Sequence, residues 1–223
     1  MLLGVSRSAA QSRLRALAEN GYVERRQIFS GQPACCRIMR PGLGAIGSDL
    51  RPPRVDLAGY QHDIGLGWLW LAAKAGAFGP VEGLSSERSM RSLDARRGTD
   101  GPRFGVGLGA GGRDGVQQLH YPDLLLKTDG KLVAVELELS PKGRGRLDQI
   151  MLGYAGEPRI DAVLYLVRDR GLGRRIETAA RKHGISGLVH IQLVAGAPAG
   201  APDLGAGAGR RPRQQTSDRS AER

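Results

Sequence analysis

The second half of the chain alternates between strand-like and helix-like spacing of its apolar residues. Alternating apolar and polar positions, or a short β-branched run, indicate a strand, whereas apolar residues at every third or fourth position indicate a helix. The predicted segments are strands over 120–127 and 132–139 joined by a turn over 128–131, a helix over 142–154, a strand over 162–167, a helix over 172–183 and a strand over 188–194. This order predicts an α/β fold around a mixed sheet.

Two helical segments are predicted before this pattern. The first spans 57–78 with apolar residues on one face, and the second spans 84–91 with Ser85 or Ser86 as its cap. The segment 98–116 is predicted to be a glycine-rich loop. Its GVGLGAGG run is only superficially similar to a dinucleotide-binding fingerprint, because no apolar strand precedes it and no helical pattern follows it.

The first 47 residues carry a different pattern, in which a basic helix is followed by a hairpin. The helix runs from about Ser6 to Glu19, and Asn20-Gly21 supplies its C-terminal stop. The segments that follow are a strand over 22–26, a turn over 30–33 and a strand over 35–38. A basic helix with a two-stranded wing is the second half of a winged helix-turn-helix.

Composition separates the remaining segments. Residues 48–56 are predicted to be a linker because of their proline and charge content. The last residues are rich in Ala, Gly and Pro and then in Arg, Gln and Ser, so they cannot bury a core. The predicted organisation is a partial winged helix over 1–47, a linker over 48–56, an α/β domain over 57–195 and a disordered tail over 196–223.

The charge balance favours a polyanionic partner. The chain has 33 Lys and Arg residues against 22 Asp and Glu residues, a formal net charge of +11. An excess of this size is most often matched by nucleic acid and sometimes by an anionic membrane surface. The alternative is a solvated surface with a basic tail.

The cysteines and the longest apolar run limit the compartment and the partners. Cys35 and Cys36 are adjacent and are the only thiols, which excludes a disulfide scaffold and a cysteine zinc site. No N-terminal stretch has the layout of a signal peptide. The longest apolar run, over 64–79, contains Lys74 and is too short to cross a bilayer. We therefore expect a cytoplasmic protein that binds DNA and no membrane, with a homodimer left open.

The second strand of the predicted hairpin carries two acids on one face. Alternate residues of a strand share a face, so Glu136 and Glu138 point the same way, about 6–7 Å apart by the rise of the strand. The turn makes the preceding strand an antiparallel neighbour, and pairing can bring Asp123 near Glu136. Carboxylates this close repel one another unless a cation neutralises them, and that cation can be Mg²⁺ or Mn²⁺ or a nearby basic side chain such as Lys142.

The chemistry of this face is left open between three interpretations. A bound Mg²⁺ or Mn²⁺ ion would serve phosphodiester hydrolysis, because it polarises the phosphoryl oxygen and lowers the pKa of an attacking water. The domain can also be folded and catalytically inactive. In the third interpretation, Glu136 and Glu138 lie on the solvated face of an edge strand and pair with Arg or Lys.

The order Pro122-Asp123 and then Glu136-Leu137-Glu138 is similar to the PD-(D/E)xK nuclease superfamily. This resemblance implies a restriction-endonuclease-like domain in which Asp123 and Glu136 hold the metal. Glu138 stands where that superfamily usually has a lysine, and Lys142 is the candidate to replace it as a catalytic residue.

Further residues follow from the same resemblance. An acid on the first core helix often completes the metal site, and Glu87 is the candidate for it. The helix after the second strand carries Gln149 and Tyr154, similar to the Gln/Tyr helix of some members.

The stretch SRSAAQSRLRALAENGYVERR resembles the recognition helix and wing of bacterial winged-helix regulators. The resemblance implies that the helix enters the major groove. The DNA-contacting residues it implies are Ser8, Gln11, Ser12, Arg13, Arg15, Arg25 and Arg26. A full domain needs one or two earlier helices and only residues 1–5 precede this one, so either the start lies further upstream or the half-domain packs on another element.

Together, the winged helix and the VELELSPK strand resemble the replication-relaxation family of plasmid and mobile-element proteins. The resemblance implies DNA binding in plasmid replication or mobilisation, with metal-dependent DNA nicking as the candidate activity. The alternative is a non-catalytic winged-helix transcriptional regulator with an inactive nuclease-like assembly domain.

The histidines and tryptophans are expected to be structural. His62 is predicted to be buried or to cap a helix, and His120 to lie on a strand surface, although its position two residues before Pro122 can bring it to a site. Trp68 and Trp70 are predicted to lie in the core or at an interface.

Overall fold

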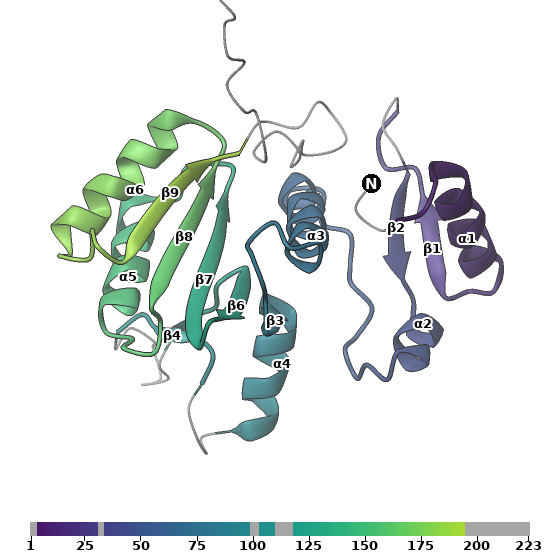
Figure 1. The fold of residues 1–223 in the computed structure, drawn as a ribbon, viewed down its shortest axis with the longest axis horizontal. Helices are drawn as coiled ribbons and strands as arrows, with labels where there is room; N and C mark the ends of the chain where they lie inside the picture. The colour runs from purple at the N-terminus through teal and green to yellow at the C-terminus, as the bar shows by residue number, and fades with distance from the viewer. Residues whose placement is uncertain (1–3, 31–33, 99–102, 110–117, 195–223) are drawn as a thin grey trace, which may run out of the picture.

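The computed structural model describes residues 4–30, 34–98, 103–109 and 118–194 (Figure 1). The helices in this part are α1 (Arg7–Glu19), α2 (Arg40–Ala45), α3 (Tyr60–Lys74), α4 (Glu87–Arg97), α5 (Arg144–Ala155) and α6 (Arg170–Lys182). The strands are β1 (Val23–Arg26), β2 (Cys35–Ile38), β3 (Gly83–Ser86), β4 (Val106–Gly107), β5 (Leu119–His120), β6 (Leu124–Thr128), β7 (Lys131–Glu138), β8 (Ala162–Val167) and β9 (Val189–Leu193). The predicted disordered tail, residues 31–33 of the predicted turn, and residues 99–102 and 110–116 of the predicted glycine-rich loop lie outside the described residues.

A five-stranded mixed sheet forms the centre of the molecule, in the order β3-β6-β7-β8-β9. Strands β3, β6 and β7 pair antiparallel, whereas β7, β8 and β9 pair parallel through the crossover helices α5 and α6. The α/β fold with a mixed sheet that the sequence predicts is therefore confirmed.

Helices cover both faces of this sheet. Helices α5 and α6 pack on one face, where Ile150 and Ile176 meet the sheet residue Ala134. Helix α3 packs on the other face, where Leu69 meets Leu137 (Figure 1). The strand β7 is thus buried on both sides, and every side chain on it from Ala134 to Glu138 is buried.

A glycine of α3 faces the side chain of Leu137 on β7. A Cβ atom at Gly65 would lie 2.6 Å from Cδ2 of Leu137, so this methyl group would have to move if position 65 carried a side chain. The glycine therefore leaves room for Leu137 where α3 lies against the sheet. This close approach also brings the first turn of α3 to the end of β7.

The hairpin β6–β7 has the turn that the sequence predicts. Its register runs from Leu124 opposite Val135 to Thr128 opposite Lys131. The two turn residues, Asp129 and Gly130, have φ angles of 48° and 72°. Positive φ at both positions is the signature of a tight hairpin turn that matches the twist of the strands, and Asp-Gly favours it.

The prediction of one continuous strand over 120–127 is wrong for the first half of that segment. Leu119–His120 pairs with Val106–Gly107 in a separate small sheet, and the central strand begins only at Leu124. Pro122 lies between them and has no N–H to donate to a sheet, which accounts for the break. Asp123 therefore lies immediately before the strand and not within it.

The helix boundaries also differ from the prediction before the sheet. Helix α3 covers Tyr60–Lys74, shorter than the predicted 57–78, and the chain turns at Gly76 with a φ of 85°. The segment expected to open a helix at residue 84 is the strand β3. Helix α4 follows it, with Ser86 as its cap in a capping box with Ser89.

Residues 4–47 form the N-terminal unit, which contains α1, the antiparallel pair β1–β2 and the short helix α2. Ser6 caps α1 by accepting the N–H of Ala9 at 3.2 Å, and Val23 pairs with Ile38 at one end of the hairpin. The predicted helix and the antiparallel strand pair that follows it are present, whereas α2 has no counterpart in the prediction. Helix α1 contains no buried residue.

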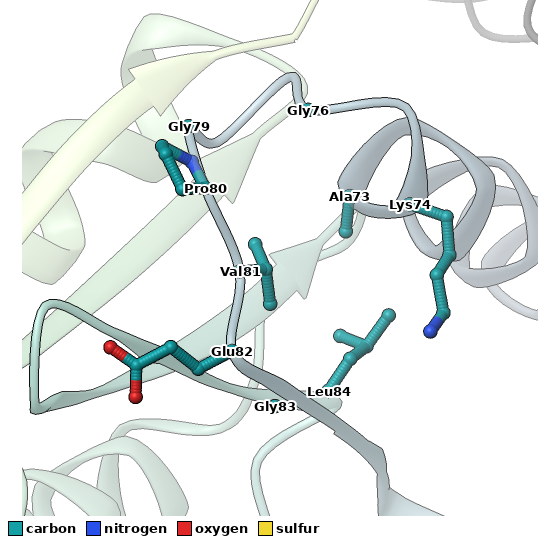
Figure 2. Close-up of a pocket in the computed structure, with 9 residues that line it drawn as sticks. All are labelled: Ala73, Lys74, Gly76, Gly79, Pro80, Val81, Glu82, Gly83 and Leu84. Atoms are coloured by element: carbon teal, nitrogen blue, oxygen red, sulfur yellow. The ribbon is translucent and has the colours of Figure 1, made fainter.

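A small hollow of about 240 Å³ lies between the end of α3 and β3, and Figure 2 draws the residues that line it. Lys74 and Glu82 are the charged side chains among the nine residues that line it. The hollow lies away from the polar network described below. No helix in the described part of the chain is long and apolar enough to cross a membrane.

Candidate functional site

Three buried carboxylates meet where the hairpin β6–β7 joins the parallel half of the sheet. Asp123, Glu136 and Glu138, the acid cluster, are 8%, 2% and 5% exposed. Because Leu124 pairs with Val135, the antiparallel register places Asp123 beside Glu136. The interpretation of Glu136 and Glu138 as a solvated edge face is wrong, because β7 is a central strand and both side chains are buried.

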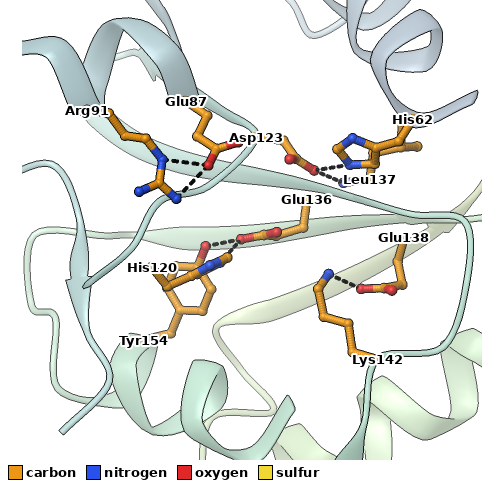
Figure 3. A network of polar contacts seen from close by, with 10 residues as sticks. All are labelled: His62, Glu87, Arg91, His120, Asp123, Glu136, Leu137, Glu138, Lys142 and Tyr154. Carbon is orange, nitrogen blue, oxygen red and sulfur yellow. Dashed lines mark hydrogen bonds and ion pairs between the residues drawn. The ribbon is translucent and has the colours of Figure 1, made fainter. Parts of the chain in front are cut away.

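Glu136 is held by two donors from other elements (Figure 3). Its Oε1 lies 2.6 Å from Nε2 of His120 on β5 and accepts a hydrogen bond from the hydroxyl of Tyr154 on α5. Burial, with the charge of Glu136 beside it, raises the pKa of Tyr154 well above its ordinary value, so this tyrosine stays a donor. The expectation that His120 lies on a strand surface is wrong, since it is buried against the acid cluster.

Asp123 is held by one backbone donor and one histidine. Its Oδ2 accepts the N–H of Leu137 at 2.7 Å and lies 3.2 Å from Nε2 of His62 in the first turn of α3. The hydrogen bond with Asp123 raises the pKa of His62 although burial opposes it. His62 therefore belongs to the site, and neither of its predicted structural roles explains its position.

Glu138 pairs with Lys142, which precedes α5. The Nζ of Lys142 donates to Oε2 of Glu138. Burial lowers the pKa of Lys142, but Glu136, Glu138 and Asp123 outweigh it and the pKa is raised. Burial raises the pKa of Glu138, although its hydrogen bond with the ammonium of Lys142 lowers it. The ammonium of Lys142 thus pairs directly with Glu138 of the acid cluster.

Two other predicted site residues do not join this cluster. Glu87 is the first residue of α4, the helix that follows β3 in the chain. Its carboxylate pairs with Arg91 at 2.7 Å (Figure 3). Only its backbone N–H reaches the site region, where it donates to the carbonyl of Asp123 at 3.1 Å. Gln149 is exposed on α5.

The fit of a divalent cation can be tested against these positions. Among the described residues, no group of three or more His, Cys, Asp or Glu side chains is arranged to hold a metal. Within the same residues, however, Oδ1 of Asp123 and Oε2 of Glu136 take no hydrogen bond. The buried hydroxyl of Tyr165, opposite Glu136 on β8, also lacks a partner there.

Mg²⁺ usually binds through one or two carboxylates and completes its shell with water and phosphate oxygens. Asp123 and Glu136 each keep one oxygen without a hydrogen bond among the described residues, which matches the number of carboxylates that such an ion uses, and the third acid that the sequence suggested is absent from the cluster. Asp94, a further buried acid, is not a candidate ligand because the N–H groups of Phe104 and Gly105 already bind it.

Arginines surround the carboxyl ends of β7 and β8, next to the acid cluster. The arginine rim consists of exposed side chains on the loops and first helical turns that follow these strands: Arg144, Arg146, Arg168, Arg170 and Arg175. Arg175 also donates to the carbonyl of Lys142 at 3.2 Å, which ties α6 to the site. Ligands of open α/β sheets bind outside the carboxyl ends of the strands, where this rim lies.

The residues predicted to contact DNA all lie on the outside of the N-terminal unit. They are exposed on α1 and β1: Ser8, Gln11, Ser12, Arg13, Arg15, Arg25 and Arg26. None of these arginines forms an ion pair with another described residue. Their guanidinium groups are therefore available to a partner.

Sequence reasoning placed Asp123, Glu136, Glu138, Lys142 and Tyr154 in one site, and the structure brings these five together. It missed His62 and expected His120 on a strand surface, with contact to a site left open. The position of His120 just before Pro122-Asp123 was a usable signal, whereas nothing in the sequence connects His62 to a carboxylate 61 residues away.

Comparison of the chain with protein-family models, with curated proteins and with solved structures found no match. The function is therefore inferred from the geometry of the chain itself.

Proposed function

We propose that this protein binds DNA and cuts one strand of its phosphodiester backbone with the help of Mg²⁺ or Mn²⁺. The observation that carries the proposal is the cluster of three buried carboxylates, with Lys142 paired to Glu138, at the strand ends where the arginine rim lies. Acids that bind a hard cation and a lysine that binds a phosphate oxygen are together suited to phosphoryl chemistry.

The two carboxylates and the lysine have different proposed roles. Asp123 and Glu136 would hold the ion, which supplies a polarised phosphoryl oxygen and a more acidic water when it is bound. Lys142 would donate to a non-bridging phosphate oxygen and stabilise the charge that develops there.

The remaining polar residues hold these groups in place. Glu138 orients Lys142, and His62, His120 and Tyr154 orient the carboxylates, so one oxygen of Asp123 and one of Glu136 stay free for the ion.

The N-terminal unit would supply affinity for duplex DNA. Its helix and hairpin resemble the second half of a winged helix, in which the helix lies in the major groove. Exposed Ser8, Gln11, Ser12 and Arg15 would contact bases and phosphates, and the other arginines would add attraction that weakens with salt. A role in plasmid or mobile-element replication or mobilisation rests on the resemblance to the replication-relaxation family.

A second function is favoured by one specific observation. Each member of the acid cluster already has a donor from the protein, and the described residues contain no group of three metal-ligating side chains. A site neutralised in this way suits a non-catalytic DNA-binding regulator, in which the α/β domain mediates assembly.

Cleavage of supercoiled plasmid separates the two functions. With Mg²⁺ or Mn²⁺ the wild-type protein should convert supercoiled plasmid to the nicked circle. Asp123→Asn and Glu136→Gln should slow this conversion on the order of 100-fold or more while keeping the shape of each side chain.

Glu177→Gln on the exposed surface of α6 is the matched control and should cut like the wild type. Plasmid that is bound in a gel-shift assay but stays supercoiled at every metal concentration would establish the regulator instead.

A further inference from the structure

A cavity of about 910 Å³ lies between the N-terminal unit and α3, and one end of it reaches the acid cluster. Its walls are β2, the link over 50–55, one side of α3 and the junction of β3 with α4. Asp123 is among the lining residues, so the cavity and the acid cluster share a wall. The cavity is at the upper end of the volume range of small-molecule sites.

The lining combines flat aromatic rings with cations. Trp68 and Trp70 of α3 line the cavity and are half-buried. Leu66 and Val55 supply apolar surface around the rings. A planar, partly polar ring can stack on such a surface, and every nucleobase has a face that can do so.

Three arginines, Arg37, Arg54 and Arg88, stand in the same lining. Arg37 donates from Nη1 to the carbonyl of Pro53 and pairs through Nη2 with Glu24, but its buried Nε has no partner within the described part of the chain. A buried donor without a partner is costly, and an acceptor on a bound molecule would satisfy it.

Two of the three acids in the lining already have partners. Glu87 is paired with Arg91, and Asp123 lies beside His62. An anionic ligand with a flat ring is therefore the chemistry that the cavity fits.

We infer that this cavity binds one unstacked DNA base, with Trp68 as the stacking surface and the lining arginines holding the adjoining phosphate. This inference deepens the proposed function, because a strand whose base occupies the cavity passes Asp123 and brings its backbone to the acid cluster. An unstacked base is available in single-stranded or locally opened DNA, so the cavity would direct the site to such segments.

Tryptophan fluorescence reports on this cavity directly, since Trp68 and Trp70 are the only tryptophans of the chain and both line it. Thymidine 5′-monophosphate should quench the emission in a saturable way, and deoxyribose 5-phosphate, which has the same phosphate and no base, should not. Equal effects of the two compounds, or no saturable effect of either, would overturn the inference.

Substitution then assigns the stacking surface. Trp68→Ala should weaken binding of single-stranded oligothymidylate about 5- to 100-fold, the range for loss of one stacked base, and leave an abasic oligomer of equal length unaffected. Trp68→Phe should keep most of the affinity, which excludes misfolding as the cause. Tyr22→Ala, an exposed aromatic outside the cavity, is the matched control and should bind like the wild type.

The failures of the two proposals are distinguishable. Quenching by thymidine monophosphate without plasmid nicking keeps the base site and removes the nuclease. Nicking with equal affinity for normal and abasic strands keeps the nuclease and removes the base site. Quenching by neither nucleotide nor oligomer, with the cavity closed to both, would indicate that a segment of this chain occupies it.

Discussion

Helix α1 and strand β7 both carry several charged side chains, but these charges lie in opposite environments. Along the 13 residues of α1 none is buried, and its arginines form no ion pair with the described residues. Along β7, Glu136 and Glu138 are buried, and each is bonded to a side chain from another element.

The difference reflects the cost of removing a charge from water. An exposed guanidinium keeps its hydration and acts over several ångströms through a field that salt screens. A buried carboxylate must find a partner within hydrogen-bonding distance, because an unpaired buried charge is very costly. The charges of α1 therefore suit long-range attraction, whereas those of β7 suit chemistry at a fixed point.

Breaking the buried pair of Glu138 should have the largest effect on stability. Lys142→Met leaves the carboxylate of Glu138 without its cation, and we expect a loss of about 3 kcal/mol in the free energy of unfolding. The side chain of Glu138 is 6% exposed and that of Lys142 is 31% exposed, so water can compensate only in part. Urea denaturation followed by circular dichroism measures the change.

An exposed pair provides the control. Lys182→Met removes a cation from Asp148, where the two side chains are 60% and 30% exposed, and the expected loss is under about 1 kcal/mol. The double variant Glu138→Leu with Lys142→Met should recover most of the stability, because no buried charge is then left. Equal losses of stability in Lys142→Met and Lys182→Met would show that the Glu138 pair behaves as a surface pair.

The strand β7 could be predicted in detail because its signals are local. The alternation from Leu132 to Leu139 fixed which acids share a face, and Asp129-Gly130 fixed the turn and hence the register that brings Asp123 beside Glu136. The burial of that face could not be predicted, because it depends on β8 and α5, which lie further along the chain.

The hydrogen-bond partners of the three carboxylates could be identified only from the folded structure. The contact of His62 with Asp123 depends on the packing of α3 against β7, which a glycine at position 65 permits, and no periodicity encodes it. Helix α1 shows the same limit in another form. Ser6 and Asn20-Gly21 predicted its ends to within one residue, yet nothing in the sequence revealed that its apolar residues Leu14 and Leu17 remain exposed.

The contact between His62 and Asp123 should have a smaller and pH-dependent effect. The folded pKa of His62 is raised above its ordinary value of 6.5. A group with a raised folded pKa contributes stability that is complete below its unfolded pKa and is lost as the pH rises through the folded value. We therefore expect His62→Gln to destabilise the protein by up to about 1 kcal/mol near pH 6 and to have little effect near pH 9.

Unfolding free energies of the variant and the wild type at both pH values test this. Titrations common to both proteins cancel in the difference, so only the contribution of His62 remains. His190→Gln, at an exposed histidine on β9, is the control and should shift neither value. A larger loss at pH 9 than at pH 6 would show that the neutral imidazole, not the imidazolium, is the form that binds Asp123.

The arginines of α1 should contribute almost nothing to stability and should act only on DNA. We expect Arg13→Ala with Arg15→Ala to change the unfolding free energy by less than about 0.5 kcal/mol, since both side chains are exposed and form no ion pair with a described residue. Affinity for duplex DNA should fall several-fold at low salt, and the slope of log affinity against log salt should decrease by about one for each arginine removed. The pair Arg13→Lys with Arg15→Lys keeps the charge and should keep the slope. If Arg13→Ala with Arg15→Ala leaves the slope unchanged, α1 does not contact phosphates. The charges of α1 and β7 then differ only in their burial.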